Sequence, residues 1–106
     1  MDTQLKKGVL DLCILSLLVK EDYYGYKLTE KLAEYMAINE GTIYPILRKL
    51  KEEKFLDTYL QEESGGPPRK YYKITEQGKV RYRYLLNEWN SFNNKVKKII
   101  RSGEDD

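Results

Sequence analysis

The chain has 106 residues, enough for one domain, and its 41% hydrophobic and 34% charged residues are typical of a folded globular protein rather than a disordered one. Its formal net charge is only +2, so a nucleic-acid partner has to be argued from where the positive charges lie. The chain contains no histidine and a single cysteine, Cys13, which excludes most zinc sites, the nucleophile–histidine pairs of hydrolases and an intrachain disulfide.

The first predicted helix runs from about Thr3 to Val19 and carries two apolar stripes. One stripe consists of Leu5, Val9, Leu12, Cys13, Ser16 and Leu17, and the other of Leu10, Ile14 and Leu18. Because a surface helix of a monomer needs only one stripe, we expect this helix to pack on its own domain and on a second subunit. Cys13 is interpreted as a small buried hydrophobe, with a reactive thiol as the alternative. Residues 9–19 are too short to span a bilayer and lack a cleavage site, which favours a cytoplasmic protein without a membrane partner.

Residues 21–24 are expected to connect this helix to a second one, from about Tyr26 to Tyr35. The buried side of the second helix is predicted to consist of Leu28, Leu32 and Tyr35. A third helix covers about Glu40 to Lys54, with Asn39 as its N-cap. Its core stripe is predicted to be Ile43, Ile46, Leu47 and Leu50. Pro45 leaves one carbonyl of this helix without a helical partner, so we expect its first turn to be kinked or tightened.

Two extended runs and a long helix follow. Residues 56–61 alternate between apolar and polar side chains, which predicts a strand, and residues 69–74 form the return strand after a Gly-Pro-rich turn. Thr75 is the predicted N-cap of a last helix from Glu76 to about Arg101. The apolar residues of that helix recur at heptad spacing, at Tyr82, Leu85, Trp89, Phe92, Val96 and Ile99. Such a seam is typical of a helix that packs along another helix.

The order helix, helix, helix, hairpin, helix predicts a mainly α fold with a small β-hairpin, namely a winged helix-turn-helix plus a long C-terminal dimerisation helix. We assign the DNA-binding domain to residues 1–75, the dimerisation helix to 76–101 and a disordered acidic tail to 102–106. The dimer seam is predicted to consist of Leu85, Trp89, Phe92, Val96 and Ile99.

The third helix keeps a polar outer face once its core stripe is removed. That face consists of Asn39, Glu40, Thr42, Tyr44, Arg48, Lys49 and Lys51. Such side chains, with the unpaired N–H groups of a helix N-terminus, suit phosphates and base edges. Between Ser64 and Arg83 six cations accompany one acid, Glu76, so the near-neutral total hides a basic return strand and helix start. Arg69 and Lys70 follow two prolines at the hairpin tip, where they suit the DNA backbone or minor groove.

Each of these features alone is more often ordinary solvated surface, but together and in this order they favour binding to double-stranded DNA. The alternative is a winged-helix protein–protein interaction module without operator binding. The sequence contains no catalytic constellation, so we expect no enzymatic activity, no metal and no cofactor.

Three segments in order resemble the PadR family of transcriptional regulators. They are YGYKL at 24–28, GTIYPILRKL at 41–50 and GPPRKYYKITEQG at 66–78. The resemblance covers about residues 7–100, and the single terminal helix is similar to the short-form members, which dimerise through their first and last helices. It implies that the third helix enters the major groove and that the wing contacts the flanking minor groove or backbone. The outer face and the resemblance together give as DNA contacts Tyr24, Asn39, Thr42, Tyr44, Arg48, Lys51, Arg69 and Lys70.

The resemblance further implies a homodimeric repressor that a small aromatic or drug-like effector releases from its operator. It also implies that Tyr71 and Tyr72 anchor the wing to the body, with Tyr72 and Ile74 facing inward.

Trp89 has two interpretations that the sequence leaves open. In one it fills the dimer core at a heptad position. In the other, which the resemblance suggests, it stacks on a flat aromatic ligand in a space between the subunits. The lining of that space would then be Leu10, Ile14, Leu86, Trp89, Asn93 and Val96. Asn93 stands where the resemblance leads us to expect an acid, so a preference for cationic ligands is not expected.

Overall fold

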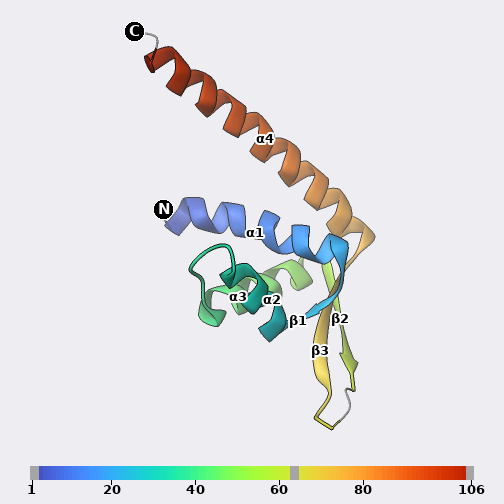
Figure 1. The fold of residues 1–106 in the computed structure, drawn as a ribbon. Helices are drawn as coiled ribbons and strands as arrows, with labels where there is room; N and C mark the ends of the chain where they lie inside the picture. The colour runs from blue at the N-terminus through green and yellow to red at the C-terminus, as the bar shows by residue number, and fades with distance from the viewer. Residues whose placement is uncertain (1–2, 63–64, 105–106) are drawn as a thin grey trace.

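The computed structural model describes residues 3–62 and 65–104, and within them it contains four helices and three short strands (Figure 1). In chain order these are α1 (Thr3–Lys20), β1 (Tyr23–Tyr24), α2 (Gly25–Ala33), α3 (Glu40–Glu52), β2 (Leu56–Gln61), β3 (Arg69–Ile74) and α4 (Glu76–Glu104). The strands form one antiparallel sheet in the order β1-β3-β2, and β2 and β3 make the hairpin that we call the wing. The expected mainly helical fold with a hairpin is confirmed.

β1 was not expected, because residues 21–24 were assigned to a connection. A strand of two residues has no periodicity that a sequence pattern could reveal. It exists because Tyr23 and Tyr24 lie beside Tyr72 and Tyr71 of β3. The sheet therefore joins the end of α1 to the wing.

The core lies where α1, α2, α3 and the base of the wing meet. Its fully buried large side chains are Leu10, Ile14, Leu15, Leu18, Leu28, Ile43, Leu47, Leu50 and Leu56. The predicted stripe of α3 is buried in full, and Tyr72 and Ile74 face inward as expected. The second stripe of α1, Leu10, Ile14 and Leu18, is buried in the core of its own chain, and α4 of the same chain also packs against α1.

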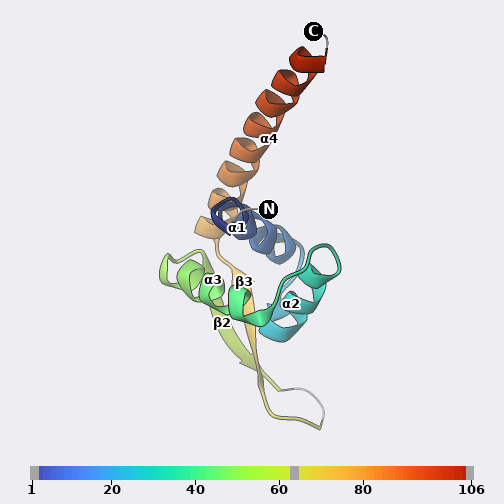
Figure 2. The same ribbon diagram turned by 90° about the vertical axis from the view of Figure 1, so that its left-hand side faces the viewer.

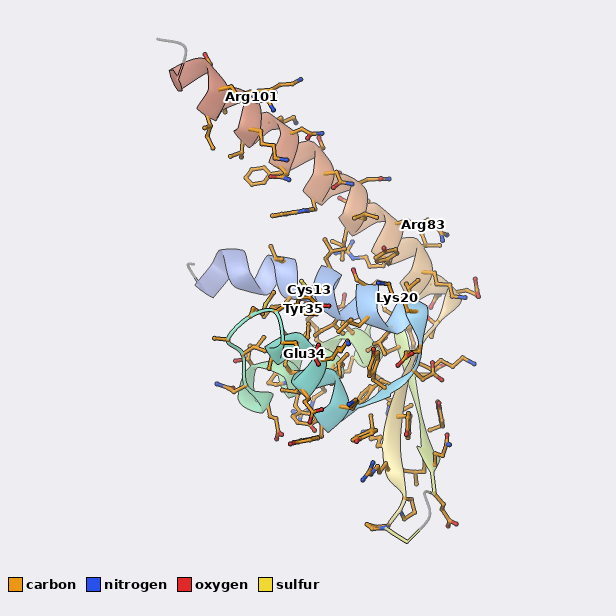
Figure 3. All side chains as sticks on the ribbon, viewed as in Figure 1. Cys13, Lys20, Glu34, Tyr35, Arg83 and Arg101 are labelled. Atoms are coloured by element: carbon orange, nitrogen blue, oxygen red, sulfur yellow. The ribbon has the colours of Figure 1, made fainter. Side chains whose placement is uncertain are left out.

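Both helices of the helix-turn-helix end earlier than predicted. α2 ends at Ala33, where the N–H groups of Tyr35 and Met36 donate to the Leu32 carbonyl, and Tyr35 is 75% exposed rather than buried (labelled in Figure 3). α3 ends at Glu52 because Lys54 adopts the left-handed φ of 71°.

The residues after α3 form a compact helix stop. The Phe55 N–H donates to the Leu50 carbonyl at 2.9 Å and the Lys54 N–H to the Lys51 carbonyl at 3.0 Å. This pair of bonds around a left-handed residue is a Schellman motif, which satisfies carbonyls that a helix end otherwise leaves unpaired.

The start of α3 agrees with the sequence analysis. Asn39 caps the helix, since its Oδ1 accepts a hydrogen bond from the Thr42 N–H at 3.1 Å. The same N–H lies 3.1 Å from the Asn39 carbonyl oxygen, an i→i+3 bond of the kind found in a tightened turn. Pro45 thus sits inside a helix whose first turn is tight, as expected.

The start of α4 is hydrogen-bonded to the residues that follow α3, and Thr75 makes these bonds. The Thr75 hydroxyl donates to the Lys54 carbonyl at 2.7 Å and accepts from the Gly78 N–H at 2.9 Å, while the Thr75 N–H donates to the Phe55 carbonyl at 3.0 Å. A Cβ on Gly78 would overlap the Phe55 carbonyl oxygen, so only glycine allows this approach. The predicted N-cap is confirmed, and the junction sets the direction of α4.

From this junction α4 projects away from the body, on the side opposite the wing (Figure 1). The radius of gyration is 16.4 Å, compared with about 13 Å for a compact chain of this length. Arg101 lies near the distal end of α4, away from the other helices (Figure 3). The helix continues to Glu104, so the tail expected at 102–106 is wrong for residues 102–104, and residues 105–106 lie outside the described part.

The Thr75 hydroxyl provides a test of the junction. Thr75→Val keeps the shape of the side chain but removes the hydroxyl that bonds Lys54 and Gly78. We expect it to lower the free energy of unfolding by about 1–2 kcal/mol, the usual cost of losing an N-cap. Thr75→Ser, which retains the hydroxyl, should lose much less. Urea unfolding of all three proteins at one protein concentration measures this, and equal stability of the valine and serine variants would contradict the assigned role.

Candidate nucleic-acid interface

The candidate interface is the side of the body from which the wing projects. Figure 2 shows α2 and α3 on this side of α1, with α4 leaving on the other side. The outward residues of α3 divide into two sets. Tyr44, Arg48 and Lys51 are exposed and lie on one side of the helix at spacings of four and three residues. Thr42 and Lys49 lie on the other side, seven residues apart.

The second set faces α1. The Lys49 ammonium is 2.6 Å from the Asp11 carboxylate of α1, so its charge is already paired within the chain. Thr42 is half-buried, and its N–H is taken up by the Asn39 cap. The cap also occupies the Asn39 Oδ1 atom, which leaves the amide nitrogen of Asn39 to donate to a nucleic acid. The first role of Asn39 and Thr42 is therefore to stabilise the start of α3.

Within the first set, Tyr44 lines a shallow depression of about 210 Å³ between the start of α2, α3 and the wing. Its lining consists of Tyr24, Gly25, Tyr26, Tyr44, Arg69, Lys70 and Tyr72. The structure thus brings together four of the predicted DNA contacts, Tyr24, Tyr44, Arg69 and Lys70. Tyr26, 57% exposed, was not among the predicted contacts. Its place two residues after Tyr24, at the first turn of α2, is the signal that could have included it.

Gly25 holds Tyr44 in this depression. A Cβ on Gly25 would lie 2.6 Å from Cε1 and 2.7 Å from the hydroxyl oxygen of Tyr44, so the ring packs directly on the backbone of α2. Burial raises the pKa of Tyr44, and the charge of Glu40 raises it further. The phenol is therefore protonated at neutral pH and can donate a hydrogen bond to a phosphate or a base edge.

Tyr72 connects the depression to the core. Burial is the main cause that raises its pKa, and the positive charge of Arg48 opposes the shift, which places that guanidinium near the wing base. The Lys70 ammonium lies 5.7 Å from the centroid of the Tyr72 ring, and the Arg69 guanidinium lies 4.5 Å from the centroid of the Tyr24 ring. Both cations remain exposed. Arg69 and Lys70, at the turn end of the wing strands, thus each place a cation over an aromatic face.

The cations of α4 in the predicted basic run do not belong to this surface. Lys79 pairs with Glu76 on the first turn of α4 at 3.2 Å. The Arg81 guanidinium lies 5.8 Å and 5.2 Å from the ring centroids of Phe55 and Tyr84. Arg83 lies on α4, on the other side of the body from the wing (Figure 3). The expectation of one basic surface through residue 83 is wrong, because the wing and α4 extend to opposite sides of the body (Figure 1).

The candidate ligand lining also needs correction. Leu10 and Ile14 are 1% and 0% exposed in the core of their own chain, so they cannot line a space between subunits. A depression of about 270 Å³ does lie beside Trp89, between α1 and α4. Its lining consists of Gly8, Val9, Leu12, Leu85, Glu88, Trp89 and Phe92. Leu86, Asn93 and Val96 are half-buried but are not part of that lining.

Residues 3–62 and 65–104 give little support for a metal site or a reactive thiol. No group of three or more metal-ligating side chains occurs among them. Half-burial raises the pKa of the Cys13 thiol, which keeps it protonated and favours its interpretation as a hydrophobe. Within the same residues no helix has the length and apolar character needed to cross a membrane.

The chain is similar to a well-defined group of proteins. The model of the transcriptional regulator PadR-like family matches residues 14–84. The crystal structure of a PadR-like transcriptional regulator from Bacillus cereus has a TM-score of 0.84 and 36% sequence identity, over 92% of this chain and 97% of that one. The negative transcriptional regulator PadR of Bacillus subtilis is 32% identical over 85 residues, 76% of this chain and 44% of the relative. The structure of Bacillus subtilis PadR in complex with operator DNA has a TM-score of 0.66 and 30% identity, over 74% of this chain and 46% of that one.

The contact between Gly25 and Tyr44 yields a coupling experiment. Gly25→Ala should lower the free energy of unfolding by about 1–3 kcal/mol, because the added methyl group overlaps the ring. In a Tyr44→Ala background the ring is absent, and the same substitution should cost much less. Urea unfolding of the four proteins measures the coupling. Additive effects would mean that the ring does not pack on Gly25.

Proposed function

Since the chain belongs to the PadR-like family of transcriptional regulators, which are not enzymes, we propose that it binds operator DNA as a homodimer and represses transcription from it. The observation that carries the proposal is that Tyr44 of α3 and the wing cations Arg69 and Lys70 line one depression. One relative supports it, since PadR of Bacillus subtilis is a negative transcriptional regulator and its structure has been determined in complex with operator DNA. A cytoplasmic location is part of the proposal.

On this surface we assign base and phosphate contacts by position. Tyr44, Arg48 and Lys51 follow one side of α3, so a major groove that receives the helix meets a phenol and two cations in succession. Arg69 and Lys70 lie at the turn end of the wing strands, and we assign them to the flanking backbone or minor groove. Asn39 and Thr42 lie at the start of α3, where the Asn39 amide nitrogen and the Thr42 hydroxyl are the groups assigned to a phosphate.

The proposed dimer uses the distal part of α4. Phe92 is 55% exposed and Ile99 72% exposed, which is unusual for large apolar side chains at heptad spacing. Trp89 and Val96 continue the same seam. Leu85 was expected in the seam as well, but it packs against the core of its own chain and so belongs to the body. Two chains paired in this way would present two α3 helices to successive turns of one duplex.

Release by a small aromatic or drug-like effector completes the proposal. The depression beside Trp89 supports it, because it lies between α1 and α4 next to the proposed dimer seam. The competing function is a protein–protein interaction module. Binding to DNA that does not depend on sequence and hardly changes with salt would favour that competitor.

Neighbouring residues of α3 provide a matched test of DNA contact. Arg48→Ala should weaken binding to DNA from the promoter of its own gene by about 1–3 kcal/mol if the guanidinium reads a base. Lys49→Ala removes the same charge, but this lysine is paired with Asp11, and we expect a clearly smaller loss. Fluorescence anisotropy at several salt concentrations measures both. Equal losses would show that the pairing does not withhold Lys49 from DNA.

The dimer seam is tested by placing one negative charge on either side of α4. Phe92→Asp should convert the dimer to a monomer in sedimentation velocity, because an unpaired charge in an apolar interface is strongly unfavourable. Asn94→Asp adds the same charge on the opposite side of the helix and should leave the dimer intact. A Phe92→Asp protein that still sediments as a dimer would place the interface elsewhere.

A further inference from the structure

The outer face of the three-stranded sheet carries a row of tyrosines that the core does not use. Tyr24 of β1 lies opposite Tyr71 of β3, and Tyr71 lies opposite Tyr59 of β2. Side chains of directly opposed residues share a face of a sheet, and successive residues of a strand alternate between faces. The row therefore lies on the face away from the buried Tyr72 and Ile74.

The rings of this row are in contact. Tyr59 and Tyr71 stack with centroids 5.5 Å apart and ring planes 14° apart, and Tyr71 meets Tyr24 edge to face at 5.5 Å. The last ring of the row, Tyr24, lies 4.5 Å below the Arg69 guanidinium. Arg69 is two residues from Tyr71 along β3, so it belongs to the same face of the strand.

The other end of the row is fixed to the segment before β1. The Tyr59 hydroxyl donates to the Asp22 carboxylate at 2.6 Å. This bond is the main cause that raises the pKa of Tyr59 to about 12, so the phenol stays a donor at neutral pH. The contacts thus run from Asp22 across β2 and β3 and back to Tyr24, which tightly limits the movement of each ring.

We propose that the row Asp22–Tyr59–Tyr71–Tyr24, which we call the tyrosine ladder, positions the Arg69 guanidinium for contact with the DNA backbone. An arginine loses much rotational freedom when it binds a phosphate, and a side chain held in place beforehand loses less. The ring face of Tyr24 attracts the Arg69 guanidinium, and the Arg69 residue remains exposed to solvent. Tyr24 is then a positioning residue rather than a DNA contact of its own.

The inference rests on the proposed DNA-binding function. It implies that Arg69 and Lys70 are positioned by different sets of residues. Lys70 points to the opposite face, where it lies over the Tyr72 ring near α3. Arg69 is held by the ladder and Lys70 by the core. Replacement of a ladder residue should therefore affect binding only through Arg69.

A double-mutant cycle tests this coupling. Tyr24→Leu and Tyr24→Phe are made in the wild-type and in an Arg69→Ala background, and their affinity for promoter DNA of the protein's own gene is measured by fluorescence anisotropy at several salt concentrations. Tyr24→Leu should weaken binding roughly two- to fivefold in the wild-type background, the range expected for one exposed cation–π contact. Tyr24→Phe keeps the ring and should bind like the wild type. In the Arg69→Ala background Tyr24→Leu should have no further effect.

If Tyr24→Leu lowers the affinity for DNA equally in both backgrounds, Tyr24 contacts the DNA itself and the inference is overturned. If it lowers the affinity in neither background, the inference is overturned as well. If Tyr24→Leu melts well below the wild type in circular dichroism, Tyr59→Phe takes its place, because it removes only the bond to Asp22. Its effect should likewise vanish without Arg69, and persistence would again overturn the inference. If the wild-type protein shows no DNA binding that depends on salt and on sequence, the proposed function itself is wrong. Failure of the proposed function is therefore distinguishable from failure of the Tyr24–Arg69 coupling.

Discussion

Burial of one side of α3 is the constraint on which the rest of this molecule depends. Ile43, Ile46, Leu47 and Leu50 are all in the core, and each such side chain contributes about 1.5–3 kcal/mol when it leaves water. The helix needs this contribution, because Gly41 and Pro45 make it a poor helix by propensity and most helical stability comes from packing. Once the stripe is buried, Tyr44 and Arg48 must face outward beside the wing, and Lys49 must face α1.

The second constraint is the short chain between α3 and the wing. Lys54 turns the backbone through a left-handed conformation, and Thr75 bonds back to its carbonyl. Because Gly78 has no side chain, α4 starts in direct contact with Phe55. These contacts direct α4 away from the wing, so the surface proposed for DNA and the seam proposed for a partner chain lie on opposite sides of the body.

The sheet has two faces with different tasks. Tyr72 and Ile74 fix the wing to the core on one face, and Tyr59, Tyr71 and Tyr24 form a stacked row on the other. A wing of two strands is marginally stable by itself. Here β1 adds a third strand, and the aromatic contacts across all three strands give the hairpin a fixed relation to α2 and α3. Arg69 lies over the Tyr24 ring on one face, and Lys70 lies over the Tyr72 ring on the other.

The sequence by itself determined the features that depend on near neighbours. The stripe of α3, the caps at Asn39 and Thr75, the two strands of the wing and the family motifs all follow from residues a few positions apart, and each was predicted correctly. Hydrogen bonds of caps and the periodicity of side chains are local, so a pattern in the chain is enough to reveal them.

Only the tertiary structure decided which side chains from distant parts of the chain contact one another. No local pattern reveals that Asp11 takes up the charge of Lys49 across 38 residues, that Leu10 and Ile14 face the core instead of a partner, or that α4 carries Arg83 away from the wing. The tyrosine ladder is of the same kind, because it depends on the register of three strands that are distant in the chain. Such contacts are set by the packing of whole elements, and their energies arise only when those elements meet.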